Sequence, residues 1–236
     1  MNTIVTATIV AFLITLLTTP LVRLLAVRWG LVDDPRIRPH PAHTHTGIIP
    51  RAGGLAIYLG TVIAILLFLP LTKLIVGIII AATILTLVGL IDDKGDVSPY
   101  LRLATNATAA LIVIGTGAGI PFVTNPLSGG VIQLDTWRVS FDFFGTHSIL
   151  VWADLLAFIW ILWTMNIVGW SAGVDGQMPG FVTIGAFVLG LLSLRFSSAD
   201  PSQLYVTILA FLIAGSFLGF LPWNVYPQKI MPGYSG

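Results

Sequence analysis

Two adjacent carboxylates stand where a long apolar stretch ends, in I-D-D-K-G-D-V-S-P-Y at 91–100. At a membrane boundary Asp92 and Asp93 repel each other unless a cation or a proton neutralises them. Mg²⁺ is the natural partner, because it prefers hard oxygen ligands and brings substrate phosphates with it. A carboxylate beside the metal can also serve as a general base. The alternative is a pair of helix-end aspartates solvated by water at the headgroups.

The polar segment 30–54 gathers three histidines, three arginines and two aspartates. His40, His43 and His45 are candidate metal ligands, because imidazole binds zinc and other transition metals. The four prolines of this segment argue against a fixed ligand geometry. Arginine with histidine is typical of a site for phosphate oxygens. The segment is equally typical of a basic loop that only anchors the topology.

Two further polar segments carry single candidate residues. In the segment 165–180, Asn166 ends an apolar stretch, and Asp175 lies in a glycine-rich turn suited to wrapping a ligand. The segment 222–236 supplies Asn224 and Lys229, and lysine can hold phosphate as a point charge. Each segment is a weak signal alone, so its meaning depends on what the fold brings together.

Composition indicates which solvent surrounds the elements that carry these residues. Of 236 residues, 56% are hydrophobic and 9% are charged, and the mean hydropathy is +0.95. Soluble domains carry about 25% charged residues, so the bilayer is the solvent that fits. A net charge of +1 provides no basic field for nucleic acid. The absence of cysteine excludes disulfides, thiolate metal sites and cysteine nucleophiles.

The apolar stretches predict an all-α polytopic membrane protein with about seven transmembrane helices. The expected spans are 3–27, 55–71, 74–91, 103–120, 149–168, 181–196 and 204–222. We expect residues 1–236 to form a single transmembrane domain.

Lysine and arginine set the expected orientation. With the N-terminus outside, eight of the 11 Lys and Arg residues fall on the cytoplasmic side, which is a clear positive-inside bias. The loops 28–54, 92–102, 166–180 and 223–236 are then cytoplasmic, and they make this the active face of a multi-pass protein of the cell (inner) membrane. The extracytoplasmic loop 121–148 reads as a turn followed by a short amphipathic, β-hairpin-like strand pair.

Together the four cytoplasmic loops resemble one family, the polyprenyl-phosphate N-acetylhexosamine-1-phosphate transferases of glycosyl transferase family 4. The branch that initiates O-antigen and teichoic acid synthesis is the most similar, and the peptidoglycan translocase is related to it. The motifs occur in the family's order: H-T-G-I-I-P-R-A-G-G at 45–54, G-L-I-D-D-K at 89–94, N-x-x-x-x-x-x-G-V-D-G at 166–176, and F-L-P-W-N-x-x-P-x-K-I at 220–230.

The resemblance implies that a polyprenyl phosphate attacks the β-phosphorus of a UDP-N-acetylhexosamine, with Mg²⁺ or Mn²⁺, and that UMP leaves. This is the first membrane step of cell-envelope polysaccharide synthesis. Asp92 and Asp93 match the catalytic and metal-binding pair. The matched substrate-binding positions are His45, Arg51, Lys94, Asn166, Asp175, Asn224 and Lys229. The implied partners are the lipid carrier, the UDP-sugar and membrane lipid, with no nucleic acid; a homodimer is a further expectation.

Three positions depart from the family's pattern. Gly169 stands where the family has Asn, Ala172 where it has Asp, and Tyr234 where it has a metal-binding Asp. The sequence ends at Gly236, before the family's last spans, so we expect a divergent and C-terminally short member. Because a phenol is a poor Mg²⁺ ligand, the alternative is a catalytically silent relative that binds lipid phosphate or a membrane partner.

Two other classes fit the sequence less well. The pattern D-D-K-G-D at 92–96 matches the D-D-x-x-D of membrane prenyltransferases, but these need a second Asp-rich motif, which the sequence lacks. A transporter carries ionisable residues within its spans, and Asp154 is the only acidic residue inside an expected span.

Overall fold

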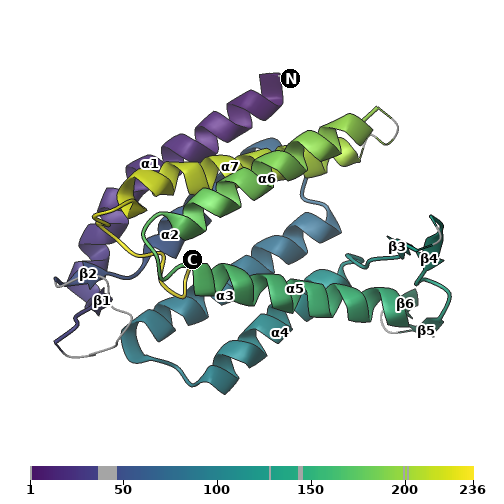
Figure 1. The fold of residues 1–236 in the computed structure, drawn as a ribbon, viewed down its shortest axis with the longest axis horizontal. Helices are drawn as coiled ribbons and strands as arrows, with labels where there is room; N and C mark the ends of the chain where they lie inside the picture. Colours follow the sequence, from purple (N-terminus) through teal and green to yellow (C-terminus); the bar gives the residue numbers. More distant parts are fainter. Residues whose placement is uncertain (1, 37–46, 128, 143–145, 199, 201) are drawn as a thin grey trace.

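The computed structural model describes residues 2–36, 47–127, 129–142, 146–198, 200 and 202–236. Within these residues the chain forms seven helices and three two-stranded antiparallel sheets, β1–β2, β3–β4 and β5–β6 (Figure 1). The helices are α1 (Asn2–Trp29), α2 (Gly53–Phe68), α3 (Lys73–Gly95), α4 (Pro99–Gly115), α5 (Val151–Ser171), α6 (Gln177–Phe196) and α7 (Gln203–Asn224). The strands are β1 (Val32–Asp33), β2 (Ile49–Pro50), β3 (Phe122–Thr124), β4 (Val131–Gln133), β5 (Arg138–Asp142) and β6 (Thr146–Leu150).

A helix occupies each of the seven predicted spans, so the all-α membrane fold is confirmed. Five helices, α1, α3, α5, α6 and α7, are long and apolar enough to cross a bilayer. Helices α2 and α4 have 16 and 17 residues, and they end before the predicted spans 55–71 and 103–120 end. Leucines on the helix surfaces are widely exposed, such as Leu17 at 66% and Leu24 at 68%. This exposure is expected where lipid is the solvent.

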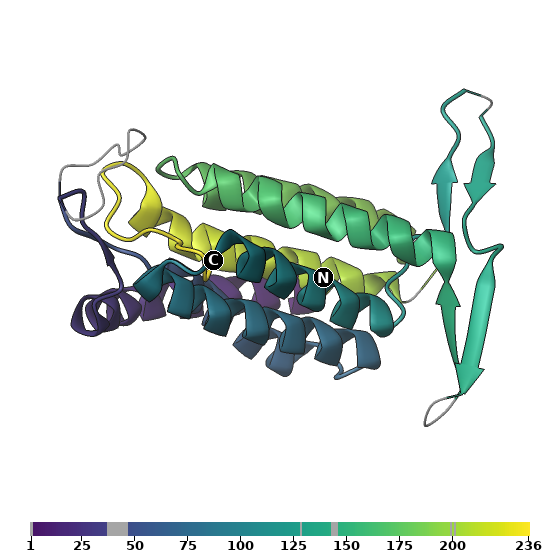
Figure 2. The same ribbon diagram turned by 90° about the horizontal axis from the view of Figure 1, so that it is seen from below.

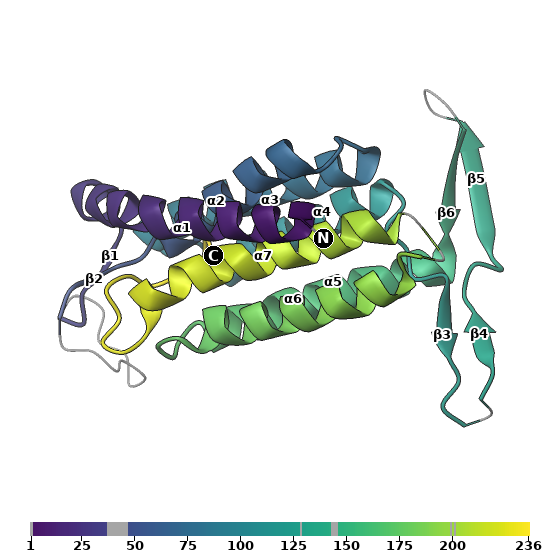
Figure 3. The same ribbon diagram turned by 90° about the horizontal axis from the view of Figure 1, so that it is seen from above.

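Small residues let α1 and α7 pack closely side by side (Figure 3). A Cβ at Gly215 of α7 would meet the carbonyl of Thr8, and a Cβ at Gly219 would meet the carbonyl of Phe12. This spacing of four residues is the pattern by which membrane helices bring their backbones together. Because α7 also packs against α6, it lies between α1 and α6 and carries Asn224 at its end into the polar region.

The polar segments lie at the opposite end of the helices from the strand pairs β3–β4 and β5–β6 (Figure 2). Strands β1 and β2, the segment 225–230 and the α5–α6 connection lie at one end of the helices, and β3 to β6 lie at the other. The loop 121–148, predicted to hold one strand pair, forms two hairpins, with Val123 opposite Ile132 and Val139 opposite Ile149.

Capping fixes the α3–α4 turn that carries the aspartate pair. Helix α3 ends at Gly95, and Asp96 adopts the left-handed conformation with φ 48° while its N–H bonds to the carbonyl of Asp92. Ser98 then caps α4 by accepting a backbone N–H, and Pro99 occupies the first turn, where a missing N–H costs nothing. This short turn sends α4 back beside α3.

Candidate active site

The predicted aspartate pair lies in the last turn of α3, and each residue is only 1% exposed. Two arginines from other elements face it. Arg51, between β2 and α2, places Nε 3.6 Å from Asp93 Oδ1. Arg102, in the first turn of α4, donates from Nε to Asp92 Oδ1 at 2.7 Å. Each buried carboxylate therefore has its own guanidinium partner, which offsets much of the cost of burying charge.

Two more carboxylates join this cluster through the arginines. Asp33 of β1 lies 3.9 Å from the Arg51 guanidinium. Asp96 lies 3.9 Å from the Arg51 guanidinium and 4.0 Å from that of Arg102. These contacts link four carboxylates to two guanidinium groups, and the exposed Lys94 follows the aspartate pair at the end of α3.

The C-terminal segment 231–236 uses both oxygens of Asp93. The backbone N–H of Tyr234 donates to Oδ1 at 2.8 Å, and the Ser235 N–H and hydroxyl donate to Oδ2 at 3.3 and 3.0 Å. Gly233 has a φ of +70°, and a Cβ there would collide with the Asp93 carboxylate. Glycine is therefore required both by the backbone conformation and by this close approach. Asp93 acts as the anchor of the segment 231–236.

The same segment caps the start of α2. The Gly53 and Gly54 N–H groups donate to the carbonyls of Met231 and Pro232 at 2.9 and 2.8 Å, and the Met231 N–H donates to the Pro50 carbonyl at 2.8 Å. The N-cap residue Ala52 has no side-chain acceptor, so these backbone bonds satisfy N–H groups that a helix start leaves free. The end of the chain thus joins α2 and α3 at the site.

Tyr234, which we expected at the position of an Asp in the family's pattern, binds Arg102. The Arg102 guanidinium donates from Nη1 to the Tyr234 hydroxyl at 2.7 Å and lies 3.9 Å from the centre of its ring. This is a combined hydrogen bond and cation–π contact. Arg102 therefore bridges Asp92 and Tyr234, and the phenol orients the arginine.

Asp92 keeps one carboxylate oxygen available. Its Oδ1 accepts from Arg102 and from the Val97 N–H at 2.9 Å, whereas Oδ2 is buried and finds no donor among the residues that the structure describes. A buried oxygen without a partner is costly unless a cation or a proton meets it. Nor do the described residues gather three acidic or histidine side chains into a metal cage. This donor set fits Mg²⁺, which commonly takes one or two carboxylates and completes its shell with substrate phosphates and water.

Asp175 and Asn224 join the turn before α6 to the segment 225–230. Asp175 Oδ2 accepts the Gln228 N–H at 3.1 Å, and Asn224 Oδ1 accepts the Gly176 N–H at 3.0 Å. The Asn224 amide donates to the Ile230 carbonyl at 3.1 Å. Asp175 Oδ1 is buried without a donor among the described residues, so it is a second oxygen open to a ligand. These bonds position the chain that runs on to Asp93.

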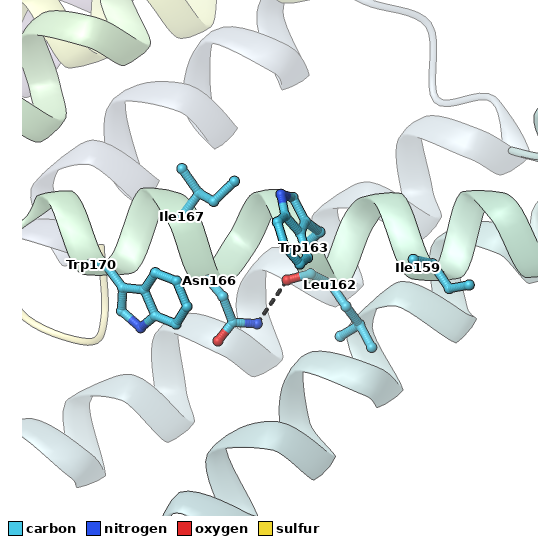
Figure 4. A pocket seen from close by; sticks show the side chains of 6 residues that line it. All are labelled: Ile159, Leu162, Trp163, Asn166, Ile167 and Trp170. Carbon is cyan, nitrogen blue, oxygen red and sulfur yellow. Dashed lines mark hydrogen bonds between the residues drawn. The ribbon is translucent and has the colours of Figure 1, made fainter.

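Asn166 is placed differently from the other predicted site residues. Its amide donates to the Leu162 carbonyl at 2.7 Å, within α5, as Figure 4 shows. It lies in an otherwise apolar groove of about 310 Å³, between Trp163 and Trp170. This hydrogen bond stays within α5, and among the described residues no contact joins Asn166 to the aspartate pair.

Of the predicted site residues, the structure brings Arg51 into contact with Asp93, beside Asp92, and leaves others apart from this cluster. Lys229 places Nζ 5.2 Å from the centre of the Trp223 ring, beside the segment that Asp175 and Asn224 hold. His45, together with His40 and His43, lies outside the described residues. Sequence reasoning missed Arg102, Asp33 and Ser235 as members of the site. The available signal for Arg102 was its place in the first turn of the helix that follows the aspartates.

Ala172 and Gly169 are the two other positions at which we expected a departure from the family's pattern. Ala172 packs against an apolar cluster that includes Met178 and Phe220. The carbonyl of Gly169 accepts the Ala172 N–H at 3.2 Å and so closes the end of α5. Both residues therefore serve the local fold of the α5–α6 connection.

Comparison with known proteins places these features in a family. Residues 75–236 match glycosyl transferase family 4. A probable undecaprenyl-phosphate N-acetylglucosaminyl 1-phosphate transferase of Bacillus subtilis (strain 168) is 29% identical over 99% of this chain and 59% of its own length. A decaprenyl-phosphate N-acetylglucosaminephosphotransferase of Mycobacterium leprae (strain TN) is 33% identical over 96% of this chain and 56% of its own.

A phospho-N-acetylmuramoyl-pentapeptide-transferase of Moorella thermoacetica (strain ATCC 39073 / JCM 9320) is 27% identical over 86% of this chain and 60% of its own. The chain thus spans somewhat more than half the length of these relatives. Since the family match covers most of the chain, including the aspartate pair and the segment 231–236, this protein belongs to glycosyl transferase family 4.

Proposed function

We propose that this protein transfers a sugar-1-phosphate of the N-acetylhexosamine type from a UDP-sugar to polyprenyl phosphate. In this reaction an oxygen of the lipid phosphate attacks the β-phosphorus of the UDP-sugar. The bond from that phosphorus to the bridging oxygen breaks, and UMP leaves with the electron pair. The product is a polyprenyl diphosphate sugar, which would begin a cell-envelope polysaccharide.

The observation that carries the proposal is the free oxygen of Asp92. A buried carboxylate oxygen without a donor, at the polar end of a membrane helix, is suited to a divalent cation that also holds a diphosphate. Mg²⁺, or Mn²⁺, bound there would neutralise charge on the diphosphate and its developing leaving group. The names of two relatives contain undecaprenyl phosphate and decaprenyl phosphate, and this supports a polyprenyl phosphate as the acceptor here.

The other residues of the site would position the substrates. Arg51 and Arg102 already aim donors at carboxylates, and a phosphate entering the cluster presents oxygens of the same kind. Asp175, with its free Oδ1, and Lys229 lie along the segment 225–230 and would hold the nucleotide sugar. Asp93 would keep the segment 231–236 in place and so act as a positioning residue.

The positive-inside bias supports a cytoplasmic location for this end of the helices. UDP-sugars are made in the cytoplasm, which agrees with this orientation. A homodimer stays a prediction, to be tested by measuring the mass of the detergent-solubilised protein.

UMP release tests the proposal. Purified protein in nanodiscs would receive Mg²⁺, undecaprenyl phosphate and a panel of UDP-N-acetylhexosamines. We expect release that depends on the lipid and the metal and falls at least tenfold in Asp92→Asn. Asp135→Asn, at the opposite end of the molecule, is the matched control and should retain activity. No release from the folded protein would contradict the proposal.

A silent, lipid-phosphate-binding relative is the second candidate, and the Tyr234 contact favours it. Arg102 bound to Tyr234 and Asp92 gives the cluster an internal cation where the family's pattern has a further carboxylate. Such a protein would bind undecaprenyl phosphate in nanodiscs, measured with a fluorescent polyprenyl analogue, and release no UMP with any of the sugars.

A further inference from the structure

The hairpins β3–β4 and β5–β6, here called the transverse hairpins, cross the helix axes at the end opposite the aspartate pair (Figures 2 and 3). They extend past the helices on both sides. If α1, α3, α5, α6 and α7 cross a bilayer, the outer parts of both hairpins therefore lie over the surrounding lipid (Figures 2 and 3). In this position the hairpins touch the membrane surface once the helices stand deep enough in the bilayer.

The register divides the hairpin β5–β6 into an apolar and a polar face. Val139 pairs with Ile149, whereas the neighbouring pair is Ser140 with Ser148. Because successive residues of a strand point to opposite faces, the two pairs lie on different faces. Val139 and Ile149 are 45% and 46% exposed, so nearly half of each residue stays uncovered by the described residues, although Ile149 also lines a cavity beside α4 and α5.

The hairpin β3–β4 is apolar on both faces. Val123 pairs with Ile132 on one face, and the other face carries Phe122 opposite Gln133 and Val131 opposite Thr124. Val123 and Ile132 are 42% and 47% exposed, Phe122 and Val131 are each 55% exposed, and Leu127 in the connecting turn is 97% exposed. Both hairpins thus expose apolar residues, and β5–β6 alone sets an apolar pair opposite a pair of serines.

Two-stranded hairpins need support that these do not find within the protein. An isolated hairpin is at best marginally stable in water, and stable ones rest on further strands or on an apolar surface. Among the described residues neither transverse hairpin pairs with a third strand. An apolar surface in contact with the exposed pairs would provide the missing support.

The junction with the helices has the composition of a membrane interface. Trp137 and Trp152 lie with ring centres 5.9 Å apart where β5 meets α5, and tryptophan is enriched at the headgroup level. Beside them a cavity of about 890 Å³ opens between β6 and the ends of α4 and α5. Leu111 and Phe158 are among its lining residues, together with Lys73 and Asp154, so it offers apolar walls to an acyl chain and charges of both signs.

We propose that the hairpin β5–β6 lies flat on the bilayer, with Val139 and Ile149 facing lipid and Ser140 facing water. The occupant of this apolar face is the leaflet opposite the aspartate pair. The hairpin β3–β4, apolar on both faces, lies against the same leaflet. The two hairpins then limit how deep the helices stand in the membrane.

Spin labels on single cysteines test this directly, because the chain has no cysteine of its own. Val139→Cys and Ser140→Cys are adjacent exposed positions on opposite faces and form a matched pair. Two further variants serve as references. Leu189→Cys, at a position 62% exposed on α6, gives the accessibility of a label in lipid, and Tyr226→Cys, at a position 82% exposed at the polar end, gives that of a label in water. Labelled full-length protein in phospholipid nanodiscs would be measured by power saturation with oxygen and with a water-soluble nickel chelate.

We expect the Val139 label to resemble the Leu189 label, with several-fold lower nickel accessibility than the Ser140 label. Nickel accessibility equal to that of the Tyr226 label at both positions would place the hairpin in water and overturn the proposal. Shielding of the Val139 label from both reagents, with spin–spin broadening, would show a second copy on this face and would also overturn it. Unchanged melting temperatures of the labelled proteins verify that each variant is folded.

Discussion

Asp93→Asn removes the charge that anchors the segment 231–236, at nearly constant side-chain volume. Asparagine keeps one acceptor oxygen, which can serve the two Ser235 donors, but it then turns its own N–H₂ toward the Tyr234 N–H. The Arg51 ion pair at 3.6 Å is lost as well. One hydrogen bond to a charged group contributes about 1.5–3 kcal/mol, so the segment should open roughly 10- to 100-fold more often.

Hydrogen exchange measured by mass spectrometry reports this opening. A peptide covering 228–236 contains the Tyr234 and Ser235 amides that Asp93 protects. We expect faster exchange in Asp93→Asn by the same roughly 10- to 100-fold factor, since the exchange rate follows the population of the open state. Asp92→Asn is the neighbouring control, because neither Asp92 oxygen accepts a hydrogen bond from a described residue of that segment. Equal exchange in Asp93→Asn and the unmodified protein would refute the anchor role.

Four other outcomes follow from the geometry. Arg102→Lys keeps the charge but cannot both stack on Tyr234 and bridge to Asp92, so a loss of about 1.5–3 kcal/mol predicts roughly 10- to 100-fold slower UMP release. Tyr234→Phe keeps the ring under the guanidinium and loses one hydrogen bond at a half-exposed position, which should lower stability by about 0.5–1.5 kcal/mol in thermal unfolding. Gly219→Leu forces α7 away from α1 and should cost about 1–3 kcal/mol, seen as a lower melting temperature in detergent, whereas Gly185→Leu, with open space around it, should not. Asp92→Asn should raise the Mg²⁺ concentration for half-maximal UMP release at least tenfold, and an unchanged Mg²⁺ dependence would remove Asp92 from the metal site.

The membrane character and the helix positions were predictable from the sequence. Apolar runs near the length of a bilayer crossing are a local property, and each predicted span contains a helix. The amphipathic pattern of 121–148 also predicted strands, although it did not separate one hairpin from two. Helices α2 and α4 ended earlier than predicted, because the backbone becomes extended at Leu69 and takes a φ of +101° at Gly117 although apolar residues continue.

The residue types of the site were likewise predictable, but their partners were not. Carboxylates at the end of an apolar run, on the side rich in arginine, indicated a phosphate and metal site without any coordinates. The resemblance to the family extended this to Arg51, Asp175, Asn224 and Lys229. Asn166 instead donates a hydrogen bond within its own helix, and neither composition nor motif spacing predicts this contact.

By itself the sequence determined that this is a membrane protein of glycosyl transferase family 4, with a polar end built around Asp92 and Asp93. Only the tertiary structure decided how these adjacent residues differ. Asp93 faces the amide of Tyr234, 141 positions further along the chain, whereas Asp92 faces Arg102 and retains a free oxygen. Successive residues of a helix point about 100° apart, so two identical side chains meet different neighbours. Those neighbours are set by the packing of α2, α4 and the segment 231–236, which no local pattern encodes.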